Sequence, residues 1–172
     1  METRTYKVYK FGELSEEQQA KVLEHYYDIN VDYEWWDSTY EDAKTVGLKV
    51  KGFDLGRGSS CEINYIEDAC FTAHEIVQNH GEKCETYIDA VAFLKDRDKI
   101  VNEAKKDEDG EFENEYELDE KLDEIEYEFL KTLSEDYHIM LRDGYEYLIS
   151  EEAIKETLES NEYDFTKDGK ID

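Results

Sequence analysis

The chain has 172 residues, of which 47 are acidic and 20 are basic, giving a formal net charge of −27. Nucleic acid and anionic membrane surfaces repel so negative a protein, so we expect it to bind neither directly and to attract a strongly basic protein instead. Three cysteines, an odd number, argue against a disulfide scaffold. No run approaches the roughly 18 apolar residues of a membrane span. Together these features predict a soluble cytoplasmic protein.

The N-terminal part of the chain predicts a strand followed by two helices. Alternating residues rich in Tyr, Val and Thr predict the strand over Thr3–Phe11. Ser15 and Gln18 have the spacing of a capping box, which predicts a helix that continues to about Tyr27. The second helix is predicted over residues 33–47 and ends on a glycine, as is typical of a helix C-terminus. The inward positions of the first helix are expected to include Ala20, Leu23 and Tyr27.

The middle of the chain predicts a β-hairpin and two further helices. Leu48–Leu55 and Cys61–Ile66 alternate on either side of a glycine-rich turn, as the strands of a hairpin do. Asp68 is suited to cap a third helix over Ala69–Asn79. A fourth helix is predicted over Glu85–Lys105. Its common apolar side is expected to consist of Tyr87, Val91, Leu94 and Val101.

Residues Asp107–Glu128, which we call the acidic segment, contain thirteen carboxylates and a single cation, Lys121. An acidic loop, 107–114, is expected to lead into a long helix that continues to Leu141 with one buried stripe. The stripe consists of Leu118, Leu122, Ile125, Phe129, Leu133 and Met140. If the acidic segment were helical throughout, at ~1.5 Å rise per residue, it would carry one carboxylate per roughly 2.5 Å of axis. That spacing is comparable with the ~3.4 Å between phosphates along a DNA strand.

The C-terminal part predicts one more helix and a hairpin. Gly144 interrupts the helical pattern, so the next five residues, YEYLI, form either a short strand or the tail of the long helix. Ser150 is suited to cap a helix over Glu151–Glu159. Tyr163–Ile171 contains the Asp-Gly pair of a hairpin turn.

Together these elements predict an α+β fold, in which a small, mostly antiparallel sheet is packed by five or six helices, one of them long and acidic. We expect a single domain, 1–172. Its one internal shift in composition is the acidic loop, at about 107–115.

Two patterns have the ligand types of metal sites. Cys70, His74, His80 and Cys84 could bind zinc, but their spacing matches no familiar finger, and a core cysteine with a helix-terminal histidine explains the same residues. Asp164–Asp172 resembles the start of a calcium loop but ends before the bidentate Glu at position twelve. No phosphate-binding loop or nucleophile motif is present. We therefore expect no enzyme activity, no metal and no cofactor.

Aromatic residues gather near the second predicted helix, among several carboxylates that would repel a nucleic-acid backbone. Core packing is the favoured role, and anchoring on a protein partner is the alternative. The group comprises Tyr26, Tyr27, Tyr33, Trp35, Trp36 and Tyr40.

Several stretches resemble a family of small phage and mobile-element proteins. Residues 11–17 (FGELSEE) and 48–57 (LKVKGFDLGR) carry the family's opening and strand motifs, with a Trp-rich helix between them. The similarity continues through 75–87 and 151–171, and so covers most of the chain. Members are often labelled as antitoxins of toxin–antitoxin systems. The resemblance implies a phage setting, where small acidic proteins such as anti-restriction and anti-CRISPR inhibitors disarm host defences by imitating nucleic acid, and it supplies no catalytic motif.

These observations predict an inhibitor that acts in the cytoplasm of a host cell. It would block the basic nucleic-acid-binding groove of a host defence protein, either a CRISPR effector or a restriction enzyme. The alternatives are an antitoxin that neutralises a basic toxin and a phage structural or accessory protein whose acidity serves solubility. The residues expected to bind the partner are Glu113, Glu115, Glu117, Glu120, Asp123, Glu124, Tyr127 and Glu128.

Overall fold

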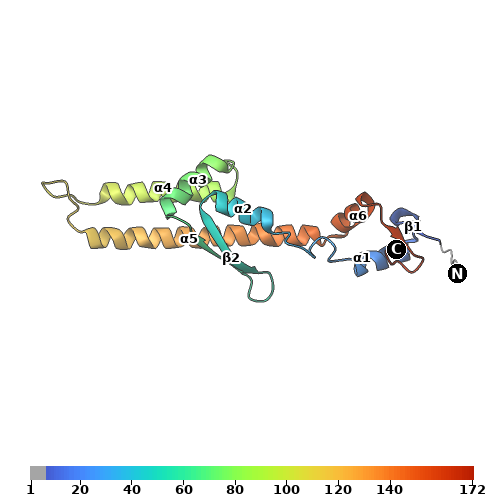
Figure 1. The fold of residues 1–172 in the computed structure, drawn as a ribbon. Coiled ribbons are helices and arrows are strands. Elements are labelled where there is room, and N and C mark those ends of the chain that lie inside the picture. Colours follow the sequence, from blue (N-terminus) through green and yellow to red (C-terminus); the bar gives the residue numbers. More distant parts are fainter. Residues whose placement is uncertain (1–6) are drawn as a thin grey trace. The chain divides into compact units, whose positions relative to one another are not determined.

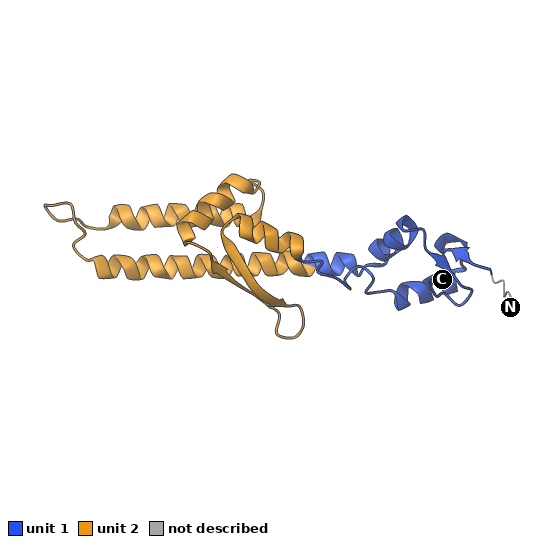
Figure 2. Cartoon of the chain, in the orientation of Figure 1, with its two compact units in different colours: residues 1–36, 143–172 blue, residues 37–142 orange. Residues whose placement is uncertain are grey.

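The computed structural model describes residues 7–172, which group into two compact units (Figures 1 and 2). Unit 1 comprises residues 1–36 and 143–172, and unit 2 comprises residues 37–142. That the units form one domain stays a prediction. The predicted α+β class is confirmed, and one long acidic helix is present. The α-helices are α1 (Glu16–His25), α2 (Asp37–Thr45), α3 (Ala69–Asn79), α4 (Glu85–Glu103), α5 (Glu115–Leu148) and α6 (Glu151–Ser160).

The strands form two separate antiparallel pairs rather than one sheet. In unit 1, β1 (Tyr9–Lys10) pairs with β4 (Asp164–Phe165). In unit 2, β2 (Leu48–Asp54) and β3 (Ser60–Tyr65) form the predicted hairpin. The predicted first strand is shorter than expected, because Phe11–Glu13 turns into a 3-10 helix that buries its phenylalanine. The beginning of that predicted strand, 3–6, lies outside the described residues.

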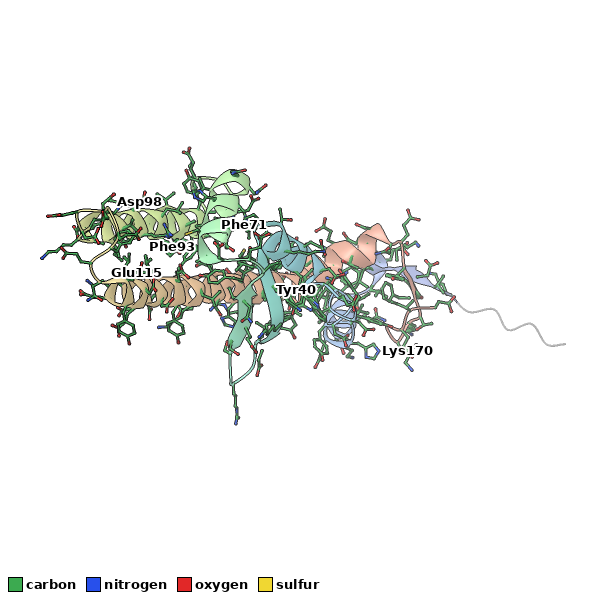
Figure 3. The ribbon with its side chains drawn as sticks, turned by 60° about the vertical axis from the view of Figure 1, so that its left-hand side comes forward. Tyr40, Phe71, Phe93, Asp98, Glu115 and Lys170 are labelled. Carbon is green, nitrogen blue, oxygen red and sulfur yellow. The ribbon has the colours of Figure 1, made fainter. Side chains whose placement is uncertain are left out.

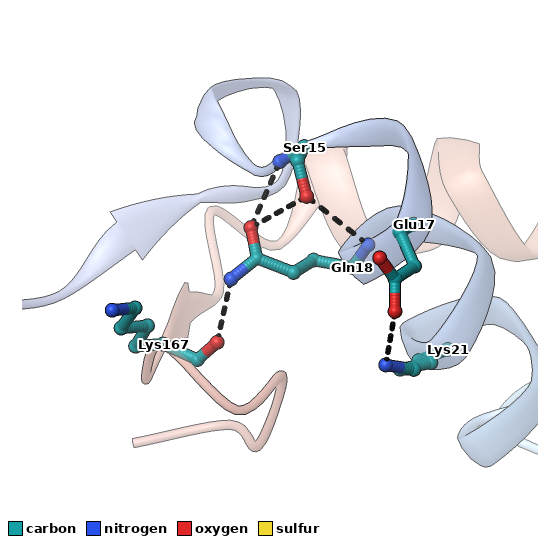
Figure 4. Close-up of polar contacts among 5 residues, drawn as sticks. All are labelled: Ser15, Glu17, Gln18, Lys21 and Lys167. Atoms are coloured by element: carbon teal, nitrogen blue, oxygen red, sulfur yellow. Dashed lines mark hydrogen bonds and ion pairs between the residues drawn. The ribbon is translucent and has the colours of Figure 1, made fainter.

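Unit 1 has its own hydrophobic core, built from both ends of the chain. Its buried side chains are Phe11, Leu14, Val22, Ile154, Leu158 and Phe165. The predicted capping box is confirmed at the start of α1, where Ser15 N–H donates to Gln18 Oε1 over 3.0 Å and Gln18 N–H donates to Ser15 Oγ over 3.4 Å (Figure 4). The amide of Gln18 also donates to the backbone oxygen of Lys167 over 2.7 Å, which ties α1 to the C-terminal turn. In that turn Gly169 has a φ of +81°, a conformation that glycine adopts without strain.

The inward face of α1 was predicted wrongly. Ala20 and Tyr27 are exposed and Leu23 is half-buried, whereas Val22 is fully buried. The helix ends at His25, so Tyr27 lies beyond the helical periodicity on which the prediction depended.

Unit 2 is organised around α4 and α5, which lie side by side (Figures 1 and 3). The rings of Phe93 and Phe129 stack between them, with centroids 4.5 Å apart and an interplanar angle of 7°. Tyr65 of the β-hairpin adds a tilted ring 6.5 Å from Phe129. Asp68 caps α3 as predicted, since its side chain accepts a hydrogen bond from the backbone N–H of Phe71.

The buried face of α4 lies about one position away from the predicted one. Thr86, Ala90 and Phe93 are buried, whereas Val91 is exposed. The remaining predicted positions are only half-buried: Tyr87, Leu94 and Val101. The small side chains of Thr86 and Ala90 were overlooked because the prediction weighted large apolar residues, although small residues allow helices to approach closely.

The core stripe of α5 is partly confirmed. Leu118, Phe129 and Leu133 are buried, but Met140 is 39% exposed, and Tyr137 and Leu141 take its place in the core. Positions seven residues apart in an α-helix do not point in the same direction but differ by ~20°. The buried stripe continues in steps of four from Leu133 to Tyr137 and Leu141, and so moves around the helix away from Met140. Of the two readings of the five residues after Gly144, the tail of the helix is the correct one, as far as Leu148.

Candidate protein-binding surface

The buried side of α5 is fixed by ring packing and by hydrogen bonds to neighbouring elements of unit 2. The Tyr65 hydroxyl donates to the backbone oxygen of Glu126 over 2.8 Å. About three turns further on, the hydroxyl of fully buried Tyr137 donates to Asp42 Oδ2, also over 2.8 Å. These contacts fix the rotation of the helix about its axis, and therefore determine which of its residues point to solvent.

All eight residues predicted to bind a partner are exposed. Five of them lie in succession on the side of α5 opposite the buried Leu118 and Phe129, and we call them the acidic face. Figure 3 shows carboxylates along this part of α5 pointing outward. The acidic face consists of Glu120, Asp123, Glu124, Tyr127 and Glu128. The other three, Glu113, Glu115 and Glu117, lie at or just before the start of the helix.

Most of these carboxylates have no counter-charge within residues 7–172. Lys121 Nζ lies 2.6 Å from Glu117 Oε1 and lowers the pKa of that carboxyl by its hydrogen bond and its charge. Lys131 Nζ lies 3.9 Å from Glu128 Oε2, a weak pair. The remaining six predicted residues have no ion pair or side-chain hydrogen bond with any described residue. Binding a cation there would therefore break no ion pair or side-chain hydrogen bond among the described residues.

The acidic loop departs from the helical spacing assumed for the whole acidic segment. Asp107 Oδ1 accepts hydrogen bonds from the backbone N–H groups of Asp109 and Glu111, over 2.9 and 3.0 Å, which closes a compact turn with Gly110 at a φ of +88°. The helix begins at Glu115, so only the part up to Glu128 can imitate a regular row of charges.

The helical part nevertheless keeps the high density of charge. It contains eight carboxylates in fourteen residues, which at ~1.5 Å per residue is one per roughly 2.6 Å of axis. A DNA strand has one phosphate per ~3.4 Å. The similarity in line density therefore holds for about four turns of α5.

Tyr116 is a member of this surface that the sequence prediction missed. Its side chain is 79% exposed, and that of Tyr127 is 67% exposed. Eleven residues separate the two, close to three full turns, so both lie on the same side of the helix. An exposed aromatic plane beside carboxylates suits an arginine, which can stack on the ring while it pairs with the acid. The signal that could have found Tyr116 is its four-residue spacing from Glu120.

The zinc-type residues do not assemble into a metal centre. Cys70 is half-buried on α3, Cys84 is exposed just before α4, and His74 is exposed. His80 donates or accepts through Nδ1 at 2.7 Å from Thr86 Oγ1, inside the protein. Within residues 7–172 no three His, Cys, Asp or Glu side chains come together as ligands for an ion.

The aromatic group near α2 is only partly core. Trp35 and Trp36 are half-buried and meet edge to face, 5.6 Å between centroids, and Trp35 also meets Tyr145 at 5.7 Å. Tyr27 and Tyr33 are exposed. The half-buried members are Tyr26, Trp35, Trp36 and Tyr40, so packing accounts for those four.

No protein-family model, curated protein or solved structure matches the chain. The resemblance to small phage proteins therefore stays a prediction. In the described part of the chain, no helix is both long and apolar enough to cross a lipid bilayer.

Proposed function

We propose that this protein is an inhibitor, acting in the cytoplasm of a host cell, that occupies the basic nucleic-acid-binding groove of a nuclease. The observation that supports the proposal is the acidic face of α5, a rigid row of exposed carboxylates most of which lack a counter-charge among the described residues. A CRISPR effector or a restriction enzyme is the proposed target, which follows the resemblance to small phage proteins.

The proposed mechanism is direct competition for cations. Arg and Lys side chains that hold phosphates would instead form charge-assisted hydrogen bonds with Glu120, Asp123 and Glu124. Tyr116 and Tyr127 would add exposed aromatic rings on which guanidinium groups can stack. A phosphate backbone offers no such rings, and stacking would favour arginine over lysine. Because the carboxylates are exposed, association should be fast and should weaken as salt rises, since screening acts over ~8–10 Å.

The test is a cleavage assay in which purified restriction enzymes and CRISPR effectors are incubated with the protein before DNA is added. For an inhibited nuclease, inhibition should decrease when either the DNA or the salt concentration is raised. The fourfold charge reversal E120K/D123K/E124K/E128K should abolish inhibition while leaving the fold intact, because all four side chains are exposed.

The matched control is E24K/D28K/D32K/E34K, which changes the net charge by the same amount at exposed positions of unit 1. This control should inhibit as the original protein does. If both variants lose inhibition equally, overall charge and not the acidic face is responsible. If neither loses it, the mimicry proposal is wrong, and inhibition of a basic toxin by another surface becomes the hypothesis to test.

A further inference from the structure

Unit 2 contains a cavity of about 580 Å³ that the proposed inhibitory function does not use. It opens between α2, the α3–α4 loop and the second half of α5. Six of its lining residues matter for its chemistry: Asp42, His80, Glu85, Asp136, Ile139 and Met140. Its volume falls within the range of ~300–1,000 Å³ that is usual for small-molecule sites.

We propose that this cavity binds an organic cation, a flat amidinium or guanidinium group carried on an apolar body, with Asp136 as its counter-ion. Among residues 7–172, the lining contains three carboxylates and no lysine or arginine. Such a combination favours a positively charged ligand, since the attraction between opposite charges is strong where water is partly excluded.

Asp136 is the carboxylate most in need of a counter-charge. When the carboxyl is ionised, its buried Oδ2 has no hydrogen-bond partner among the described residues. When it is protonated it shares a hydrogen bond with the side chain of Asp89 on α4, and the other charged groups around it are also acidic, Glu85 on α4 and Glu135 on its own helix. Burial and these neighbours raise its pKa to about 7. The structure therefore holds a carboxyl group that a nearby cation would keep ionised.

The opposite wall supplies a fixed negative charge. Asp42 accepts a hydrogen bond from Tyr137, and its Oδ1 lies 3.4 Å from Nε2 of His80. These two neighbours, His80 most strongly, lower the pKa of Asp42 although burial opposes them. His80 is itself held by Thr86, so this wall is ordered before any ligand enters.

The apolar part of the lining indicates what the cation should be attached to. Ile139 and Met140 line the cavity yet are 44% and 39% exposed. A ligand that covers them removes apolar surface from water, which contributes roughly 25 cal/mol per Å². A bare metal ion or a free ammonium ion would gain nothing from these side chains, whereas an aromatic amidine would.

The experiment uses benzamidine as the probe and benzamide as its neutral, nearly isosteric partner. Binding to the whole protein is followed by amide chemical shifts and by calorimetry. At pH 8 benzamidine should bind saturably, with shifts concentrated at His80, Thr86 and Met140. Benzamide should bind at least tenfold more weakly. Between pH 8 and pH 5.5 the affinity for benzamidine should fall by up to about thirtyfold, because the ligand must then displace a proton from Asp136, whose pKa is about 7.

Two variants and one control test the residues. Asp136→Asn should weaken benzamidine binding at least tenfold and remove its pH dependence. Met140→Lys, at an exposed position, should block the cavity with a tethered cation and weaken binding by a similar factor. Asp119→Asn makes the same chemical change at an exposed position near the start of α5, away from the cavity lining, and should change the affinity less than twofold.

Equal binding of benzamide and benzamidine would overturn the proposal, because the site would then recognise shape and not charge. Unchanged affinity in Asp136→Asn, or shifts that map elsewhere than the cavity, would overturn it too. None of these readouts depends on a nuclease, so this inference and the proposed function can fail separately.

Discussion

The two halves of α5 place carboxylate groups in opposite environments. In the first half, the carboxylates of the acidic face point to solvent and lack partners or are only weakly paired. In the second half, Asp136 lies among other acids with one oxygen buried. Water and salt screen the first group, so each of its charges costs little to place there and has little effect beyond ~8–10 Å. Burial removes that screening from Asp136, so its charge is costly and acts locally.

The comparison shows that acidity alone does not define a site in this protein. The exposed half can attract a large basic partner without reorganising, whereas the buried half can respond to protons or to a small cation. Both depend on the same anchoring of the helix by Phe129 and Tyr137. Four substitutions test this contrast.

Phe129→Ala should have the largest effect, because it removes the anchor common to both halves. It deletes the ring that stacks on Phe93 and meets Tyr65, and leaves a cavity between α4 and α5. Loss of a buried aromatic side chain costs about 3–5 kcal/mol. Urea unfolding followed by circular dichroism measures the loss. Tyr127→Ala, an exposed aromatic residue on the same helix, should change stability by under ~0.5 kcal/mol.

Tyr137→Phe should measure how much the hydrogen bond from Tyr137 to Asp42 stabilises the second half of α5. The substitution keeps the ring in the core but removes the hydroxyl that donates to Asp42. A buried hydrogen bond to a charged group contributes about 1.5–3 kcal/mol. The same unfolding assay checks the value, with Tyr127→Phe as the matched loss of an exposed hydroxyl. Equal effects of the two substitutions would mean that the buried bond contributes nothing.

Asp136→Asn should change the pH dependence of the free energy of unfolding, because it removes a partly buried ionisable carboxyl group. The pKa of Asp136 is about 7 in the folded protein, against an ordinary value of 3.8. Between pH ~4 and about 7, the folded state therefore keeps a proton on Asp136 that the unfolded chain has released. The contribution of this proton to the free energy of unfolding is fully present below pH ~4 and is lost as pH rises through about 7. After allowance for partial exposure, Asp136→Asn should be more stable by ~1–2 kcal/mol at pH 8 and little changed at pH 4.

Thermal unfolding across this pH range is the measurement, and Asp119→Asn is the control. The control makes the same chemical change at an exposed position of the same helix. A gain in Asp136→Asn that is the same at pH 4 and pH 8 would show that packing, and not the ionisation of Asp136, is responsible.

Local signals predicted much of the secondary structure but little of the three-dimensional arrangement. The caps at Ser15, Asp68 and Ser150 depend on a few neighbouring residues, and all three are confirmed. The raised pKa of Asp136 depends on its burial and on Asp89 and Glu85, which lie more than forty positions away, and no pattern within α5 marks it out. The exposed carboxylates were easier to predict, because a solvent-facing position follows from the apolar stripe on the opposite side.

Glu124→Lys should have the smallest effect on stability and the clearest meaning for function. Glu120 and Glu124 are one turn apart and both exposed, so they repel each other, and a lysine at 124 would instead pair with Glu120 in the favourable orientation. We expect a gain of about 0.2–0.5 kcal/mol in the free energy of unfolding, smaller in high salt, together with weaker inhibition of the target nuclease. A purely solvating role for the acidic face predicts the same gain in stability with no loss of inhibition. Measuring both quantities on one variant therefore distinguishes a surface that binds the target from one that only solvates the protein, because only the first loses inhibition when stability rises.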